Sequence, residues 1–276
     1  MRVLFIGDII GQPGRRMVAR HLKALVADHA AELVLANAEN AAGGFGITPS
    51  VGEELFSLGI DLLTSGNHVW DKKEAEGYLA KEARVLRPAN YPEEAPGTGV
   101  HILAKDGRMV GVVNIQGRAF LPAIDCPFKA ADREVAQLRQ VTDTILVDFH
   151  AEATAEKQAF GWYLDGRVSA VIGTHTHVQT ADERILPKGT AYLTDAGMTG
   201  PLESVIGVEI PPILKRYLTG INYRFESVKS GPGIFSGCIV GVDEETGRAH
   251  EIRRIYEVTA ERTVEDEKKE KKEASV

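Results

Sequence analysis

The stretch Gly173-Thr174-His175-Thr176-His177 follows a mostly apolar run, residues 168–172, which has the length and the ending of a buried strand. In an extended backbone, residues two apart point to the same side, so both imidazoles are expected to face one spot beyond the strand. A His-x-His pair alone is weak evidence for a metal site, because such histidines are often exposed or hydrogen-bonded in place. Its meaning therefore depends on what ends the other strands.

Four other apolar strands also end in side chains that can bind metal. These side chains are Asp8, Glu39, Asn40, Asn67, His68 and His150. Taken singly, each has a plainer explanation: a helix cap for the aspartate, loop or turn polarity for the glutamate and the asparagines, and a core position for the last histidine. Ligands of open α/β sheets bind beyond the carboxyl ends of the strands. Because five strand ends supply carboxylates, amides and imidazoles there, the sequence predicts a metal centre at that edge.

The mixture of donors indicates which metals would bind. No cysteine lies among these residues, which argues against a closed structural zinc site. Oxygen donors combined with imidazole favour manganese, iron or another first-row ion. The number of donors is about what two ions need once waters are added, and Glu39 can bridge them. Two ions roughly 3.5–4 Å apart can hold a hydroxide and clamp a phosphoryl group.

The order of predicted elements indicates the fold class. Strands alternate with helices in the first half of the chain, and helices are expected at residues 15–29, 49–58 and 71–81. Asp106-Gly107 is a hairpin signal between strands at 100–104 and 109–115. Later strands are expected at 223–229, 234–242 and 250–256. The pattern predicts a layered α/β sandwich with mixed sheets in a single domain, residues 1–257, followed by a charged tail, residues 258–276.

Composition excludes several function classes. The 276 residues carry a formal net charge of −7, which argues against a binder of duplex nucleic acid but allows a small phosphate-bearing substrate. The two cysteines, Cys126 and Cys238, lie far apart in sequence and do not suggest a disulfide framework. This fits a protein of the reducing cytosol. The first apolar run is interrupted by Asp8 and is too short to cross a membrane. A cytoplasmic protein without membrane contact is expected, and exposed apolar strands leave a homo-oligomer open.

The order of the motifs resembles the calcineurin-like metallophosphoesterase superfamily. The motifs that carry this resemblance are Gly7-Asp8, Gly66-Asn67-His68, the lone His150 after a strand, and Gly173-Thr174-His175-Thr176-His177. Further segments resemble the bacterial YmdB-like branch of the superfamily. They are Ala38-Glu39-Asn40, Asp148-Phe149-His150-Ala151-Glu152 and Asp195-Ala196-Gly197-Met198-Thr199-Gly200-Pro201. The resemblance extends over residues 1–257 and implies a four-layer α/β/β/α sandwich with two mixed β-sheets.

The resemblance also implies two divalent or trivalent metal ions. One ion would be held by Asp8, Glu39 and His177, with Asn40 as an extra ligand. The other would be held by Glu39, Asn67, His150 and His175, so that Glu39 bridges the ions and the histidine pair is divided between them. His68 would lie beside the phosphate, as general acid for the leaving oxygen or as charge stabiliser. The superfamily usually has a histidine two residues after its first aspartate, where this chain has Ile10.

The function implied by the resemblance is metal-dependent phosphodiester hydrolysis by a metal-bridging hydroxide. The YmdB-like branch is associated with 2',3'-cyclic nucleotides, so the implied substrate is an RNA-derived cyclic nucleotide or another small phosphate ester. Two alternatives stay open: a phosphomonoesterase, and a regulatory or interaction protein that keeps the fold with weak turnover. The candidate substrate-binding residues are Phe45, which would stack on a base, Arg118, which would pair with phosphate, and Met198, in a loop after a strand.

Overall fold

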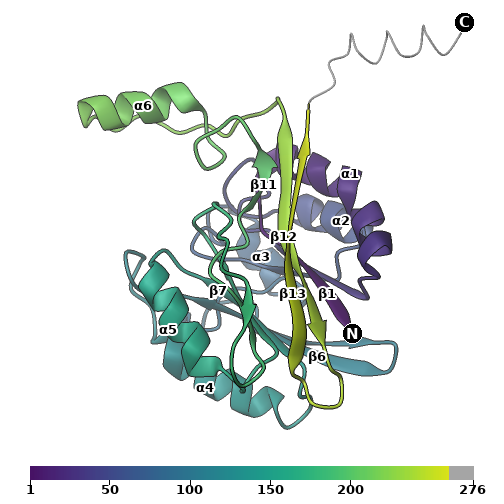
Figure 1. Cartoon of the computed structure of the whole chain (residues 1–276). Coiled ribbons are helices and arrows are strands. Elements are labelled where there is room, and N and C mark those ends of the chain that lie inside the picture. Colours follow the sequence, from purple (N-terminus) through teal and green to yellow (C-terminus); the bar gives the residue numbers. More distant parts are fainter. Residues whose placement is uncertain (261–276) are drawn as a thin grey trace, which may run out of the picture.

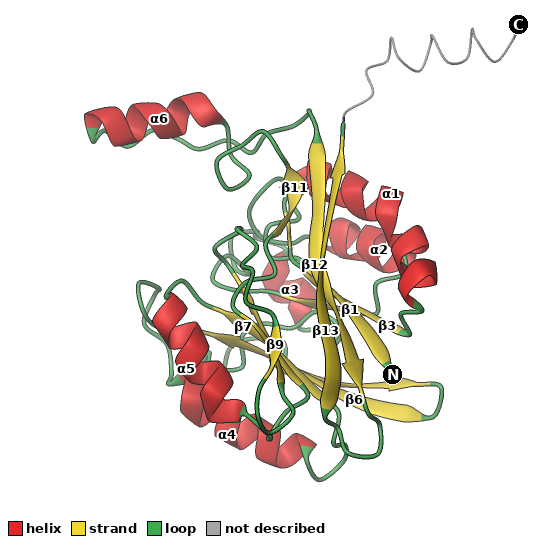
Figure 2. Ribbon diagram, in the orientation of Figure 1, coloured by secondary structure: helices red, strands yellow, loops and turns green. Residues whose placement is uncertain are grey.

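The structure is a computed structural model that describes residues 1–260. Within this range the chain forms two mixed β-sheets (Figures 1 and 2). One sheet has the strand order β2-β11-β12-β1-β3-β4, and β13 pairs with β12. Its strands are β1 (Arg2–Ile6), β2 (Asp8–Ile9), β3 (Leu33–Asn37), β4 (Leu62–Thr64), β11 (Met198–Pro201), β12 (Gly233–Val242) and β13 (Ala249–Thr259).

The other sheet has the strand order β5-β6-β7-β8-β10-β9. Its strands are β5 (Val100–Lys105), β6 (Arg108–Gln116), β7 (Ile145–His150), β8 (Ala170–Thr174), β9 (Arg184–Ile185) and β10 (Ala191–Leu193). The hairpin between β5 and β6 turns at Asp106 and Gly107, which both have positive φ, as predicted for this dipeptide.

Helices cover the outer face of each sheet (Figure 2). The first sheet is covered by α1 (Gly11–His29), α2 (Pro49–Ser57) and α3 (Ala75–Leu79), and the second by α4 (Pro127–Leu138) and α5 (Thr154–Leu164). The side chain of Thr48 caps α2 by accepting from the backbone N–H of Val51, as expected for Thr-Pro at a helix start. The last helix, α6 (Ile210–Thr219), projects from the body of the molecule (Figure 1). No helix within residues 1–260 is long and apolar enough to cross a membrane.

Alternating side chains of β1 divide between two cores. Val3 and Phe5 pack between the two sheets, whereas Leu4 and Ile6 pack beneath the helices of the first sheet. A third core lies between the second sheet and its helices, where Phe160 of α5 stacks on Phe149 of β7. The resulting order of helix, sheet, sheet and helix confirms the predicted four-layer sandwich.

Parallel pairing directs the strand ends to a common edge. In the first sheet β3 is parallel to β1 and β4, and in the second β7 and β8 are parallel to each other and to their neighbours β6 and β10. The loops that follow these strands carry most of the predicted metal-binding residues. Topology alone therefore brings together side chains that are far apart in sequence.

Three sequence predictions differ from the structure. The strand predicted at 223–229 is wrong: this segment makes only an isolated bridge, between Ser227 and Val208, because its backbone bonds to loop residues instead of a sheet. The helix predicted at 71–81 is shortened to Ala75–Leu79, since residues 71–74 form bends and turns. The strand β13 continues to Thr259, inside the segment predicted as a charged tail, and residues 261–276 of that tail lie outside the described residues.

Candidate metal centre

Seven predicted metal-binding side chains and His68 gather at the carboxyl edge of the two sheets. Asp8 begins β2, Glu39 and Asn40 follow β3, and Asn67 and His68 follow β4. His150 ends β7, and His175 and His177 follow β8. Asp8, Glu39, Asn40 and His150 are buried, while the other residues are partly exposed.

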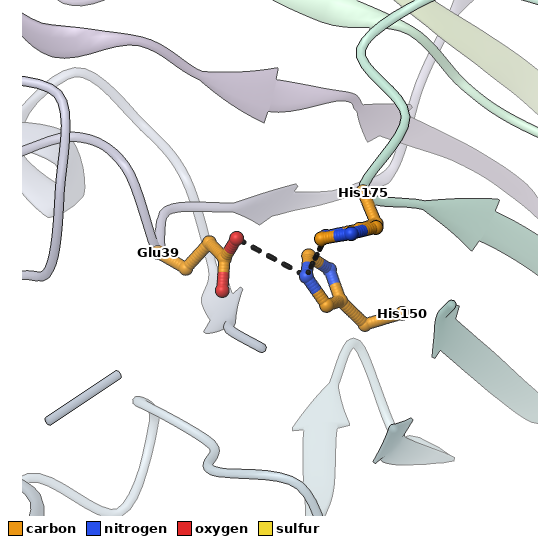
Figure 3. A group of neighbouring side chains, drawn as sticks. All are labelled: Glu39, His150 and His175. Carbon is orange, nitrogen blue, oxygen red and sulfur yellow. Dashed lines mark hydrogen bonds and ion pairs between the residues drawn. The ribbon is translucent and has the colours of Figure 1, made fainter. Parts of the chain in front are cut away.

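One half of the cluster is centred on His150 (Figure 3). Its Nε2 lies 3.0 Å from Nδ1 of His175, 3.1 Å from Oε1 of Glu39 and 3.1 Å from Oδ1 of Asn67. Donor atoms of Glu39, His150 and His175 all lie within 4.8 Å of one another, which is close enough to share one ion. This half therefore contains a carboxylate, an amide oxygen and two imidazoles around one point.

The other half of the cluster is centred on Asp8. Nε2 of His177 lies 3.8 Å from Oδ1 of Asp8 and 3.3 Å from Nδ2 of Asn40. Oδ1 of Asp8 is buried and has no hydrogen-bond partner within the described residues. Such an oxygen is costly to bury unless a cation or a donor compensates it. A metal ion beside Asp8 would supply that compensation, so the residues present fit a bound metal ion.

Glu39 lies between the two halves. Its Oε1 faces His150 and also accepts a hydrogen bond of 3.1 Å from Asn40, whereas its Oε2 accepts one of 3.1 Å from the backbone N–H of His68. The carboxylate thus contacts residues of both halves and the residue predicted to act on the leaving group.

The backbone of the 173–177 stretch corrects the argument from strand geometry. His175 has φ 101° and His177 has φ 67°, so neither residue is extended, and the expectation that both rings face one spot is wrong. The left-handed conformation turns the two rings apart, toward His150 and toward Asp8. Backbone hydrogen bonds hold this shape: the N–H of His175 donates to Asp8 and that of Thr176 to Asp195, both over 3.1 Å.

Hydrogen bonds fix which nitrogen of each key ring faces the cluster. Oγ1 of Thr174 donates to Asp148 over 2.6 Å, so it must accept the 2.9 Å bond from Nδ1 of His150. Nδ1 of His177 donates to the backbone carbonyl of Ile206 over 2.8 Å. A carbonyl can only accept, so Nδ1 of His177 also carries a proton. His150 and His177 therefore both direct Nε2 toward the cluster, as metal-binding histidines do.

Burial and neighbouring charges set the protonation of the cluster. Burial opposes ionisation of Glu39 and His150, but their mutual attraction overrides it, lowering the pKa of Glu39 to about 2 and raising that of His150 to about 9. Burial and then the charge of His150 lower the pKa of His175 to about 3, and burial raises the pKa of Asp8. An ion that binds His150 must displace a proton, so binding would release protons.

His68 lies at the mouth of the cluster with Asp71 behind it. Its Nδ1 is 2.8 Å from Oδ2 of Asp71, and its ring meets that of Phe45 edge-on with 5.2 Å between the centroids. Both rings line a cavity of about 290 Å³, together with Glu39, Asn40, His175 and His177. A substrate in this cavity would contact the metal-binding side chains and His68 at once.

The candidate substrate-binding residues are placed differently. Phe45 lines the cavity, but Arg118 does not; its backbone N–H donates to Glu156 and its side chain is exposed. Met198 is buried against Ile10 and Ile234 and does not line the cavity either.

Sequence reasoning missed several residues that support the cluster. Asp71, Asp148, Thr174 and the carbonyl of Ile206 position histidines, and Glu152 lies 3.2 Å from Nε2 of His175. Asp148 had a readable signal, since it interrupts an otherwise apolar strand. A backbone carbonyl such as that of Ile206 leaves no trace in a sequence.

Comparisons with known proteins identify the family. The family model described as "YmdB-like protein" matches residues 4–255. A "2',3'-cyclic-nucleotide 2'-phosphodiesterase" of Bacillus subtilis (strain 168) is 48% identical over 255 residues, 92% of this chain and 96% of that protein.

Solved structures agree with this match. A hypothetical protein of Thermus thermophilus superposes with a TM-score of 0.87 at 44% identity, covering 95% of this chain and 100% of that one. A crystal structure described as a novel phosphatase, from Mycoplasma pneumoniae, gives a TM-score of 0.88 at 34% identity, covering 95% and 94%. The chain belongs to the YmdB-like family, a branch of the calcineurin-like metallophosphoesterases.

Proposed function

We propose that this chain is a metal-dependent phosphodiesterase that opens 2',3'-cyclic nucleotides. The observation that carries the proposal is the position of Glu39 between two groups of donors, one around His150 and one around Asp8, with His68 adjoining. The substrate class is proposed from the printed name of the Bacillus subtilis relative.

The donor set suggests how two ions would be held. Asp8, His177 and Asn40 would bind one ion; Asn67, His150 and His175 would bind the other; Glu39 would bridge them. Oxygen and imidazole donors favour manganese or iron. When bound, such ions supply a nucleophilic hydroxide and neutralise charge on the phosphoryl oxygens.

His68 would act on the leaving group. Opening the ring breaks the bond between phosphorus and one ribose oxygen, and that oxygen needs a proton as it departs. His68 lines the cavity beside the donors, so its Nε2 is the available acid. Asp71, bonded to Nδ1, holds the ring in place.

Cys126 and Cys238 are both free thiols, as expected of a protein from a reducing compartment. These free thiols support a cytoplasmic location, which we propose for the enzyme.

The test compares two diesters with manganese present: a 2',3'-cyclic nucleotide, whose leaving group is an alkoxide, and bis-p-nitrophenyl phosphate, whose phenolate leaves without help. Removing the acid by His68→Gln should lower kcat on the cyclic nucleotide by about 10²–10⁴-fold, and lower it far less on the phenyl ester. Glu39→Gln should lower the rate on both substrates, because it weakens binding of both ions.

Equal rates of wild type and Glu39→Gln would refute the metal-dependent mechanism. Hydrolysis of phosphomonoesters alone would favour a phosphomonoesterase. Metal binding without turnover on any phosphate ester would favour a regulatory protein.

A further inference from the structure

A second, larger cavity adjoins the one that contains the metal-binding side chains. Its volume is about 790 Å³, against about 290 Å³ for the first. The two cavities share Phe45, Phe225 and Ser227 in their walls, so they lie next to each other. Ligand pockets for small molecules usually measure about 300–1,000 Å³, so the first cavity alone is at the low end of that range and the two together are at its upper end.

The walls of the second cavity are positively charged. Lys72, Arg224 and Lys229 line it, with Glu226 as its single acidic lining residue within residues 1–260. No ion pair within the described residues engages those three cationic side chains. Because the whole chain carries a net charge of −7, this local excess of cations is the reverse of the overall balance and favours an anionic ligand.

Two aromatic rings stand where the cavities meet. Phe45 comes from the glycine-rich loop after β3, and Phe225 from the segment before β12. The two segments contact each other closely. Oγ of Ser227 donates to the carbonyl of Gly43 over 3.1 Å, and a Cβ atom on Gly44 would lie only 1.6 Å from this Oγ. Cations beside flat aromatic rings are the means by which proteins hold single-stranded nucleic acid, through phosphates and stacked bases.

We propose that the second cavity binds the nucleotides that precede a 2',3'-cyclic phosphate, so that the enzyme acts on the cyclic ends of single-stranded oligoribonucleotides. This inference rests on the proposed function. The terminal phosphate enters the first cavity, the bases pass Phe45 and Phe225, and the preceding phosphates face Lys72, Arg224 and Lys229. The segment 223–229 thus forms the wall of a binding site in place of the strand that its sequence pattern predicts.

The experiment measures kcat/KM for a 2',3'-cyclic mononucleotide and for a tetranucleotide that ends in the same group. Wild type should prefer the tetranucleotide by about tenfold or more, because its additional phosphates meet the cationic side chains and its additional bases stack on the aromatic rings. The double variant Arg224→Ala/Lys229→Ala should lose most of that preference and keep its mononucleotide activity within about twofold. A matched control, Arg20→Ala/Lys23→Ala on the exposed face of α1, removes the same charge and should keep the preference.

Salt dependence gives a second readout. Three phosphate contacts predict a slope of about −2 when the logarithm of kcat/KM on the tetranucleotide is plotted against the logarithm of salt concentration. The double variant should show a shallower slope, between about −1 and 0. Equal kcat/KM for mononucleotide and tetranucleotide in wild type would overturn the inference. So would an equal loss on both substrates in the double variant.

The failure of the proposed function can be told apart from the failure of this inference. If wild type hydrolyses neither substrate, the proposed function fails. Fluorescence anisotropy with a labelled tetranucleotide 3'-phosphate then still tests the cavity: weaker binding by Arg224→Ala/Lys229→Ala than by the α1 control supports it, and equal binding overturns it.

Discussion

Replacing Thr174 by valine tests how the fold prepares His150 for metal. Thr174 is buried, and its hydroxyl donates to Oδ1 of Asp148 over 2.6 Å while accepting from Nδ1 of His150 over 2.9 Å. Valine has nearly the same shape but lacks the hydroxyl. The change therefore removes both of these hydrogen bonds and a weaker one of 3.4 Å that Nδ2 of Asn37 donates to the hydroxyl. It leaves three buried polar groups without this partner and frees His150 to place its proton on Nε2.

The magnitudes follow from these contacts. A hydrogen bond to a charged group contributes about 1.5–3 kcal/mol and a neutral one about 0.5–1.5 kcal/mol. We therefore expect Thr174→Val to lower the free energy of unfolding by about 2–4 kcal/mol. Loss of the partner that orients a metal-binding histidine typically weakens metal affinity by about 10–100-fold, and the same is expected here.

Competition with a fluorescent chelator measures the manganese affinity, and urea unfolding measures stability. Thr174→Ser is the matched control, because serine keeps the hydroxyl and loses only a methyl group; its manganese affinity should stay within about threefold of wild type. If Thr174→Val bound manganese as tightly as wild type, the hydroxyl would not orient His150 and the reasoning would fail.

Three further outcomes follow from the described contacts. Lys157→Met should cost about 3–5 kcal/mol in urea unfolding, because it leaves Asp195 buried without the ammonium that lies 2.5 Å away; a loss below about 1 kcal/mol would contradict this. After iodoacetamide treatment of the native protein, mass spectrometry should find Cys126 modified and Cys238 unmodified, because burial raises the pKa of Cys238 to about 12. Chelators should lower Tm, because an ion bound beside Asp8 would compensate its buried Oδ1; saturation at about 100 times Kd would contribute about 2.7 kcal/mol, and an unchanged Tm would oppose a bound metal.

The sequence predicts the fold well because its signals are local. Each strand end is marked by a short apolar run followed by a polar residue, and the hairpin by Asp106-Gly107. The segment 223–229 misled for the same reason: its apolar residues resemble a strand, but pairing depends on a partner strand that no local pattern specifies. Predicted metal-binding residues were found as strand ends, whereas the groups that orient them were not. Thr174 and Asp148 belong to the strands themselves, and only the register between β7 and β8 brings them together.

The orientation of His175 and His177 also depends on contacts that no local sequence pattern specifies. This is why their rings diverge instead of facing one spot, as an extended backbone would predict. A left-handed conformation costs about 1–3 kcal/mol for each residue other than glycine, and His175 and His177 both adopt it. The compensation comes from the carboxylates: Asp8 accepts from the N–H of His175 and Asp195 from that of Thr176, each a charge-assisted bond of about 1.5–3 kcal/mol. Asp195 is in turn held by Lys157, which also donates to the carbonyl of Thr174 over 2.7 Å. One buried ion pair and one predicted metal-binding carboxylate thus hold the backbone in the shape that sends the two imidazoles to different halves of the cluster. Asp8 therefore has two roles, since a change there would alter both an oxygen donor and the loop that positions two nitrogen donors.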